Sequence, residues 1–403
     1  MMRTILLAAL AALLFLAVPV SAADTDSLPG DADGDGTLTG DEVSATVLAY
    51  LDAAYMGGTG TDRTEALDAA QVYAFWGGRP KIVTDSAGKT ATLYRPLRRI
   101  VVCNGETLET LRSIGLDAGR VVAVDKYSLE KSSFFPEYQG KTNIGSIWSP
   151  DMEKIVTARP DAVFLYATIS TAACDDIQQK LEATVPGIHV FRFDCFKPAT
   201  YADEVRAIAA MTGREERGEA FIAFYESAMN TIRDGVPDAD RPRVYFEYWI
   251  DYRTVARNAG YNEKIGLAGG VNPYSGESTD YPDIDPESVI ANNPQVVVKL
   301  AGQGLEFGGY AGHDLDSFAR IRSALLLRPG WTTLDAVKNN RVYVIHSDIL
   351  GGAQHFIGTA YLAKIISPER FGTLDPQAIH QRYLTDFQGI DFDLATQGAF
   401  VYP

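Results

Sequence analysis

The chain has 403 residues, of which 46% are hydrophobic and 22% are charged, and its formal net charge is −16. This is the composition of an ordinary globular protein with room for more than one compact core, so general disorder is excluded. The excess of acidic residues argues against nucleic acid or an anionic membrane surface as a binding partner.

The first 22 residues have the pattern of a cleaved export signal. A basic residue, Arg3, precedes the apolar run 5–18, and small residues suited to a signal peptidase follow it. A retained membrane anchor is the alternative, but the apolar run is shorter than the roughly 20 residues that span a bilayer. We therefore expect a secreted protein associated with the cell surface.

Residues 31–42, which read D-A-D-G-D-G-T-L-T-G-D-E, match the calcium-binding loop of an EF-hand. The predicted ligands are the carboxylates of Asp31, Asp33, Asp35 and Glu42 and the carbonyl oxygen of Thr37. Ca²⁺ prefers several hard oxygen ligands, a glycine at the sixth position allows the sharp turn, and the final glutamate closes the shell with both oxygens. The alternative is an acidic turn that binds no metal. We expect one structural Ca²⁺ site.

The residues around this loop predict a small helical module over 28–78. Four apolar residues between Val43 and Tyr55 share one face and predict the helix that leaves the loop. A second helix is expected over 64–75. The sequence has no second acidic loop of this kind, and no matching helix is expected before the first. The module therefore resembles a dockerin-type loop and helix more than a paired EF-hand.

After this module, predicted strands and helices alternate in two series. In the first series the strands are 100–103, 121–124, 162–166 and 188–193, and the helices are 106–114, 150–158 and 175–183. In the second series the strands are 244–250, 295–300 and 341–346, and the helices are 261–268, 286–291, 316–324 and 354–366. Such alternation predicts parallel sheets covered by helices on both faces.

The predicted fold class is α/β, with two Rossmann-like lobes joined by one long helix and preceded by the small α-helical module. The joining helix is expected over Ala199 to Arg233, with a break at Gly213 as an alternative. The expected divisions are a signal peptide at 1–22, the EF-hand or dockerin-like calcium module at 28–78, an N-terminal binding lobe at 97–198, a linker helix at 199–235, a C-terminal binding lobe at 241–371 and a C-terminal tail at 372–403.

The chain has three cysteines, Cys103, Cys174 and Cys195. Because export permits disulfides, and because Cys174 and Cys195 flank neighbouring strand ends, one prediction is a disulfide between these two. Three buried free thiols are the other prediction, and the sequence does not decide between them.

Several phrases of the main body carry a family resemblance. They include Arg99-Ile100-Val101, Ser149-Pro150-Asp151-Met152-Glu153, Arg159-Pro160-Asp161-Ala162, Leu267-Ala268-Gly269-Gly270-Val271-Asn272, Asp285-Pro286-Glu287-Ser288 and Asn340-Arg341-Val342-Tyr343. In this order, over roughly 97–371, they resemble the periplasmic binding proteins for iron complexes, ferric siderophores and cobalamin, in versions associated with archaea. The acidic leader and the C-terminal tail depart from the core family.

The resemblance implies a non-enzymatic binding protein that delivers a small-molecule metal chelate to an ABC permease and its ATPase. It also implies that Glu153 and Glu287, one in each lobe, dock onto arginines of the permease. Each of these residues also begins a predicted helix, where an acid stabilises the positive helix end. We expect the protein to be monomeric.

The ligand is expected where the strands of the two lobes point toward each other, because open α/β sheets bind ligands beyond the carboxyl ends of their strands. The candidate residues at or near these ends are Asn104, Glu106, Tyr127, Trp148, Tyr166, Tyr248, Trp249, Tyr252, Arg253, Lys299 and His346. Aromatic rings with a few cations suit a flat or wrapped chelate, since rings supply apolar area and cations meet a negative group. The alternative for each aromatic is an ordinary core or rim position.

These observations favour capture of a ferric chelate or of a corrinoid- or haem-like complex, with iron present only as part of the transported ligand. Direct coordination of bare Fe³⁺ by His346, Glu247 and tyrosines ranks second, because no two-histidine, one-carboxylate spacing is visible. Among functions, an enzyme on the same two-lobed fold, such as a metal-cluster enzyme, is the second hypothesis, but the cysteines lack a cluster spacing. A calcium-dependent surface scaffold is the third, and its single loop counts against it.

Overall fold

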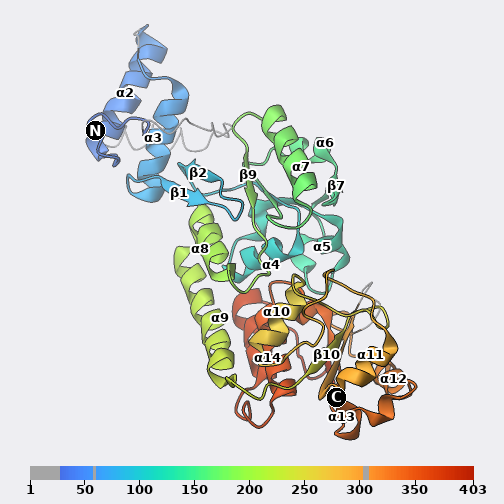
Figure 1. The fold of residues 1–403 in the computed structure, drawn as a ribbon. Helices are drawn as coiled ribbons and strands as arrows, with labels where there is room; N and C mark the ends of the chain where they lie inside the picture. Colours follow the sequence, from blue (N-terminus) through green and yellow to red (C-terminus); the bar gives the residue numbers. More distant parts are fainter. Residues whose placement is uncertain (1–27, 58–59, 303–307) are drawn as a thin grey trace.

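The computed structural model describes residues 28–57, 60–302 and 308–403. It contains a small N-terminal module, two lobes that are each built on their own sheet, and a helical connection along one side of both lobes (Figure 1). The expected signal peptide, 1–22, lies outside the described residues. In the described ranges, no helix is long and apolar enough to cross a membrane.

The N-terminal module is a pair of packed helices, α2 (Gly40–Met56) and α3 (Arg63–Trp76). Its apolar core includes Val47 and Leu67 together with Tyr94, which follows a β-hairpin that the sequence did not predict. The hairpin strands are β1 (Lys81–Thr84) and β2 (Thr90–Leu93). The Arg98 guanidinium of the first lobe lies 4.8 Å from the centroid of the Phe75 ring in α3, and Figure 1 shows the module at the end of that lobe away from the second.

The first lobe has a five-stranded parallel sheet in the order β5-β4-β3-β8-β9. Its strands are β3 (Ile100–Val102), β4 (Val121–Val124), β5 (Thr142–Asn143), β8 (Ala162–Leu165) and β9 (His189–Arg192), and a small hairpin adds β6 (Gly145–Ser146) and β7 (Ser149–Pro150). Its helices are α4 (Gly105–Ser113), α5 (Lys126–Glu130), α6 (Met152–Thr157) and α7 (Thr171–Thr184). The central strands are short, apolar and buried on both faces, as expected for a parallel sheet between helices.

The second lobe has the sheet order β10-β11-β12-β13. Strands β10 (Val244–Glu247), β11 (Val296–Ala301) and β12 (Val342–His346) are parallel, and β13 (Val401–Tyr402) is antiparallel to β12. The helices are α10 (Gly260–Leu267), α11 (Pro286–Asn292), α12 (Leu315–Leu326), α13 (Asp335–Lys338) and α14 (His355–Ile366). The first strand ends at Glu247 instead of the predicted 250, because the Glu247 carboxylate accepts the backbone N–H of Tyr252 at 3.0 Å and the chain turns there.

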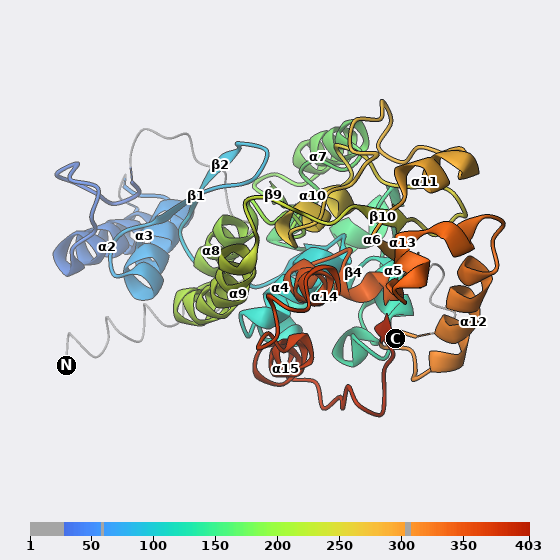
Figure 2. The ribbon, with the colours of Figure 1, turned by 60° about the horizontal axis from the view of Figure 1, so that its bottom comes forward.

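Two helices occupy the connection for which one long helix was expected. Helix α8 (Tyr201–Thr212) ends at Gly213, whose φ of 66° is left-handed, so the break that the sequence left open is present. Helix α9 (Glu215–Gly235) then packs back along α8, and Gly218 permits the close approach, since a Cβ there would lie 2.6 Å from the Cβ of Ala209. Of these two helices, α9 is the one that runs beside both lobes (Figures 1 and 2).

The C-terminal tail folds against both lobes. It forms α15 (Pro376–Arg382), a π-helical segment η6 (Tyr383–Gln388) and β13. The Tyr383 hydroxyl donates to Glu109, and the Gln388 side-chain oxygen accepts from Arg112 Nε at 2.6 Å, so the tail is bonded to the first lobe. Because β13 pairs with β12, the same tail is also part of the second lobe.

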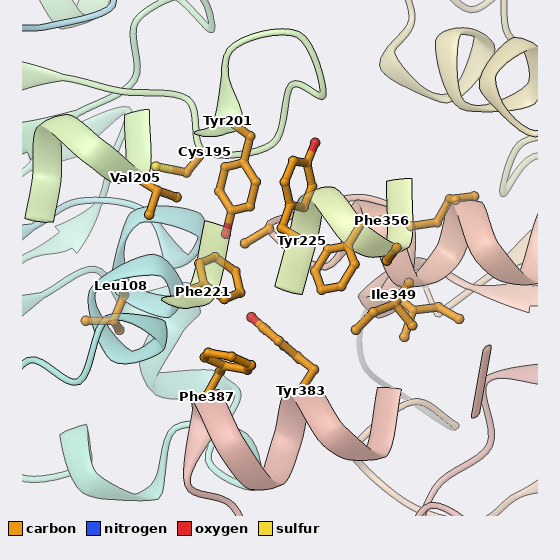
Figure 3. Packing of buried hydrophobic residues seen from close by; sticks show 14 of the residues in the cluster. Leu108, Cys195, Tyr201, Val205, Phe221, Tyr225, Ile349, Phe356, Tyr383 and Phe387 are labelled. Carbon is orange, nitrogen blue, oxygen red and sulfur yellow. The ribbon is translucent and has the colours of Figure 1, made fainter. Parts of the chain in front are cut away.

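One hydrophobic core continues from the first lobe into the second on the side of α9. Figure 3 shows Leu108 of the first lobe, Phe221 of α9, Phe356 of α14 and Phe387 of the tail around the same volume. The Phe387 ring stacks on that of Phe224, also in α9, with centroids 4.9 Å apart. A wide separation of the lobes would expose this apolar surface to water, so we expect only small lobe movements.

The disulfide predicted between Cys174 and Cys195 is wrong, and the alternative of three buried free thiols is confirmed. Cys174 packs with Cys103 on one face of the first sheet. Cys195 packs with Tyr201 on the opposite face, within the core that the lobes share. The sheet therefore separates the two sulfur atoms.

A buried lysine lies beside this shared core. Lys264 of α10 is 2% exposed, and its Nζ lies 5.4 Å from the centroid of the Tyr261 ring. Burial lowers the pKa of Lys264 to about 8, and the nearby charges of Glu263 and Glu106 only partly offset this effect. The folded protein therefore holds a cation there at neutral pH at a cost in stability.

Shortening one ring of the shared core should destabilise both lobes together. We expect Phe387→Ala to lower the free energy of unfolding by roughly 3–5 kcal/mol, because it leaves a cavity among packed rings. Hydrogen exchange measured on peptides of each lobe, with increasing urea, should show one transition that shifts for both. Leu327→Ala, at a side chain 84% exposed, is the control and should change little. Two separate transitions, with only one of them shifted, would contradict a continuous core.

Replacing Lys264 by methionine should stabilise the protein in a pH-dependent way. The unfolded chain binds this proton up to about pH 10.4, whereas the folded chain releases it near pH 8, so the penalty is complete below pH 8 and disappears as pH rises toward 10.4. We expect Lys264→Met to be more stable than the wild type by on the order of 1–3 kcal/mol at neutral pH, and this difference to shrink near pH 10. Urea denaturation at both pH values measures it, with the exposed Lys338→Met as control. A difference that is the same at both pH values would contradict the assignment.

Candidate ligand-binding site

A cavity of about 320 Å³ lies between the lobes, at the carboxyl ends of both sheets. The structure brings six of the eleven candidate residues together around it: Asn104, Glu106, Tyr127, Trp148, Tyr166 and Trp249. Five of these come from the first lobe, in the segments that follow β3, β4, β6 and β8, and Trp249 follows β10 in the second lobe. The cavity is thus placed where the strand-end rule predicts it.

The wall on the first lobe is held by side-chain hydrogen bonds. The Asn104 side-chain oxygen accepts the N–H of Thr107 at 2.8 Å and thereby caps α4, which presents Glu106 in its first turn. The Tyr166 hydroxyl donates to Glu106 Oε2 at 2.6 Å. Burial and the charge of Glu106 raise the pKa of Tyr166 well above its usual value, so the phenol stays protonated. The Trp148 ring stacks with Tyr166, with centroids 6.2 Å apart.

The wall on the second lobe is formed by Trp249, Tyr261, Tyr310, Asp348 and Gln354. Asp348 crosses to the first lobe, where its Oδ1 lies 3.2 Å from Lys131 Nζ. Burial raises the pKa of Asp348, but the charge of Lys131 and the adjacent His346 ring outweigh that effect and hold it well below its usual range. Asp348 is therefore ionised, and the pair with Lys131 fastens one lobe to the other at the cavity.

Lys299 does not line the cavity. It pairs with Glu247 on the neighbouring strand, with Nζ 2.7 Å from Oε1, and Arg328 donates to both oxygens of the same carboxylate. The pairing follows from the register of the parallel strands, which sets Lys299 directly beside Glu247. Glu247 is the last residue of β10, Lys299 lies within β11, and both are buried in the sheet layer. With its carboxylate matched in this way, Glu247 is not free to coordinate Fe³⁺, which counts against the bare-metal hypothesis.

Four more candidates also lie outside the cavity lining. Tyr248 packs on Tyr281, with ring centroids 4.7 Å apart. Tyr252 lies under the Arg328 guanidinium, and Arg253 pairs with Asp283 at 2.7 Å on the surface. His346 is buried behind Asp348, with its Nδ1 3.3 Å from Oδ2. The turn after β10 carries residues 250–253 away from the strand axis, which the strand-end rule cannot anticipate.

Sequence reasoning missed several residues that line the cavity. Asp348 is two positions beyond His346, and an extension of the candidate segment past the strand end would have found it. Lys131, Tyr261 and Tyr310 come from a short helix end, a helix and a loop, where no strand-end signal exists. As a result, the expected cations Arg253 and Lys299 are absent from the described lining, as is His346, and Lys131 is the basic residue found there.

The acidic loop of the N-terminal module has the arrangement of a cation site. Carboxylate oxygens of Asp31, Asp33 and Asp35 lie within 4.8 Å of one another. Asp31 accepts the N–H groups of Gly34 and Gly36, and Gly36 has a φ of 78°, which a side chain would disfavour. Glu42 accepts from the N–H of Ala32 and caps α2 through Thr39, so its carboxylate is held beside the loop. The donor set fits a hard divalent cation.

The two glutamates that the resemblance assigns to permease docking are both exposed. Glu153 lies in the first turn of α6 and Glu287 in the first turn of α11, after the capping residues Asp151 and Asp285. Helices α6 and α11 belong to different lobes and lie on the side of the molecule away from α9 (Figures 1 and 2). Both the capping role and a docking role are compatible with these positions.

Comparison with known proteins gives the relationship of the chain. Residues 100–349, more than half of the chain, match the family described as periplasmic binding protein. An ABC transporter substrate-binding lipoprotein of Bacillus subtilis, YvrC, is 22% identical over 302 residues, which cover 72% of this chain and 87% of that protein. A vitamin B12-binding protein of Vibrio cholerae is 22% identical over 258 residues, covering 63% of this chain and 83% of that protein.

The fold is also similar to solved structures. The TroA-like periplasmic binding protein FepB from Veillonella parvula has a TM-score of 0.71 at 23% sequence identity, covering 80% of this chain and 99% of that chain. The periplasmic vitamin B12 binding protein BtuF of Vibrio cholerae has a TM-score of 0.52 at 19% identity, covering 68% of this chain and 98% of that chain. The two-lobed α/β fold, the cavity between its lobes and the family match agree: the chain belongs to the periplasmic binding protein family.

Proposed function

We propose that the protein is the substrate-binding component of an ABC importer and that it captures a small metal chelate in the cavity between its lobes. The observation that carries the proposal is the group of aromatic rings from both lobes, Trp148, Tyr166, Trp249 and Tyr261, around one cavity at the strand ends. Such rings supply rigid apolar area for a flat or wrapped ligand. Relatives named as vitamin B12-binding proteins support a corrinoid or another metal complex as the cargo.

An enzymatic role is not supported. The relatives are named as substrate-binding lipoproteins and binding proteins, which are components of transport and not enzymes. The three buried cysteines lie on two faces of the first sheet, which is not an arrangement for holding a metal cluster.

The partners of this function are a membrane permease and its ATPase. We propose that Glu153 and Glu287 dock onto the permease, one from each lobe, since both carboxylates are exposed on the side away from α9. Export to the cell surface agrees with relatives that are lipoproteins or periplasmic proteins. An exposed negative charge in each lobe allows a permease with matching positive charges to hold both lobes at once.

We further propose one structural Ca²⁺ ion in the loop 31–42, bound by Asp31, Asp33, Asp35, Glu42 and the carbonyl oxygen of Thr37. Three carboxylates within 4.8 Å repel one another without a cation, so the ion would stabilise the loop and the start of α2. The loop is part of the N-terminal module and shares no residue with the cavity lining. The metal is therefore expected to stabilise the module without taking part in capture of the chelate. This dockerin-like arrangement favours a structural role for the ion.

Removing one ring of the cavity should weaken cargo binding without unfolding the protein. We expect Trp249→Ala to raise the dissociation constant of the bound chelate by roughly 10–100-fold, because it removes a ring that the second lobe contributes to the cavity. A thermal-shift panel with ferric chelates, haem and cobalamin identifies the chelate, and titration calorimetry measures the change. The control is Tyr55→Ala, at an exposed aromatic of α2. Equal affinities of Trp249→Ala and the wild type for the chelate would contradict the proposed site.

Neutralising Glu42 should remove calcium and leave cargo binding unchanged. We choose Glu42→Gln because glutamine still caps α2 but cannot offer two charged oxygens to the metal. Calorimetry should show Ca²⁺ affinity weakened by at least roughly tenfold, and EDTA should no longer lower the melting temperature. Asp41→Asn, one position earlier on the exposed face, is the matched control. If Glu42→Gln also weakened the chelate, the two sites would not be independent.

A further inference from the structure

The described residues that line the cavity carry more acidic than basic groups. The acids are Glu106, Glu109, Asp125 and Asp348, and the base is Lys131. The Lys131 amine is already matched by Asp348 at 3.2 Å. Another amine, on Lys264, lies behind the wall and is not part of the lining. The cleft therefore presents an excess of negative charge to a ligand.

Among these acids, Glu106 is the one best placed to meet a charged ligand. Glu109 is buried and bonded to the Tyr383 hydroxyl, and Asp125 is buried and bonded to the Ser128 hydroxyl and two backbone N–H groups. Burial also raises the pKa of Asp125 to about 6 and that of Glu109 to about 7, which lowers their negative charge near neutral pH.

Glu106, in contrast, is partly exposed and accepts a hydrogen bond from Tyr166 alone among the described side chains. The Glu106 side chain also faces the opposite lobe, since a Cβ placed on Gly352 would lie 3.6 Å from its Cγ. No salt bridge to Glu106 is present among the described residues, although the charges of Lys131 and Lys264 act on it from a longer distance. A carboxylate in a narrow cleft without a direct ion-pair partner loses hydration that is only partly replaced. A cationic ligand would supply that partner.

The aromatic rings favour the same sign of charge. Trp148 and Tyr166 are stacked on the first lobe, and Trp249 and Tyr261 face the cavity from the second. The faces of such rings are electron-rich and attract cations, and the attraction is larger where water is excluded. Rings and carboxylate therefore act together on a positive group, and neither favours an anion.

We propose that the transported chelate carries a net positive charge and that Glu106, with the rings of Trp148, Tyr166 and Trp249, holds its cationic part. The inference rests on the proposed function and narrows the cargo to cationic metal complexes. Haem, with two propionates, and ferric tris-catecholates would each bring like charge into the cleft. A cationic corrinoid or a cationic ferric hydroxamate has the required charge and an apolar surface for the rings.

Two matched pairs of probes separate charge from size. Aquacobalamin is cationic and cyanocobalamin is neutral on the same corrin ring, provided that the buffer is slightly acidic so that the axial water stays protonated. Ferrioxamine B is cationic and ferrichrome is neutral, and both are ferric trihydroxamates. Within the pair that binds, we expect the cationic member to bind roughly tenfold more tightly. A ferric tris-catecholate should bind more weakly than either. Raising the salt concentration should weaken the cationic probe most, because screening reduces its attraction to the cleft.

Variants of Glu106 assign the preference to one carboxylate. Glu106→Gln keeps the size and the hydrogen bond from Tyr166, and it should weaken the cationic probe roughly tenfold while leaving the neutral probe nearly unchanged. Glu106→Asp should retain the preference because it retains the charge. Glu216→Gln, at an exposed carboxylate of α9, removes the same charge outside the cleft and should have no effect. The salt dependence of the wild type gives an independent measurement if a variant folds poorly.

The outcomes distinguish this inference from the function on which it rests. If neither pair of probes, nor a ferric tris-catecholate, nor haem binds, the metal-chelate function fails, and the inference fails with it. If probes bind but the neutral or anionic members bind as tightly as the cationic ones, the transport function stands and the charge inference is wrong. A cationic preference that survives Glu106→Gln would overturn the role of this carboxylate. A preference that is lost in Glu106→Gln and kept in Glu106→Asp supports it.

Discussion

The continuous hydrophobic core between the two lobes is the constraint on which the rest of the structure depends. It draws residues from the first sheet, from α9, from α14 and from the tail into one apolar volume, while the smaller clusters on the other face of each sheet stay within one lobe. Because α9 and the tail both cross from one lobe to the other, the relative position of the two sheets is set by packing and not by a flexible hinge. The cavity at the strand ends exists because this packing holds the two sheets apart on one side.

Ion pairs within the second lobe then determine which charged side chains reach that cavity. The pairing of Glu247 with Lys299 and Arg328 keeps the candidate cation Lys299 inside the second lobe, and Arg253 is held on the surface by Asp283. What remains at the cavity is one lysine, matched by an aspartate of the opposite lobe, among several carboxylic acids. The electrostatic character of the site is therefore the opposite of that suggested by a count of cations near the strand ends.

Much of the fold could be predicted from the sequence because its signals are local. Buried β-branched runs and turn residues identified the strands. The alternation of strands with helices predicted a parallel sheet, and the strand-end rule then placed Asn104, Glu106 and Tyr166 at a common edge. The errors come from long-range interactions that leave no local pattern. The hydrogen bond from Tyr252 to Glu247 ends β10 early and redirects the following loop, and the face of the sheet on which each cysteine lies separates Cys174 from Cys195. The position of the tail also depends on side chains far away in the chain, such as Arg112.

The ion pair between Lys131 and Asp348 spans the two lobes at the cavity itself. This bond joins the two walls of the cavity, so a cargo that contacts Lys131 or Asp348 must compete with a bond that the protein makes with itself. The stiff packing behind the cavity means that thermal motion alone would rarely pull the walls apart far enough to discharge the cargo. Release of the cargo would then need an external source of free energy. A permease that binds both lobes and separates them during the ATPase cycle could supply it.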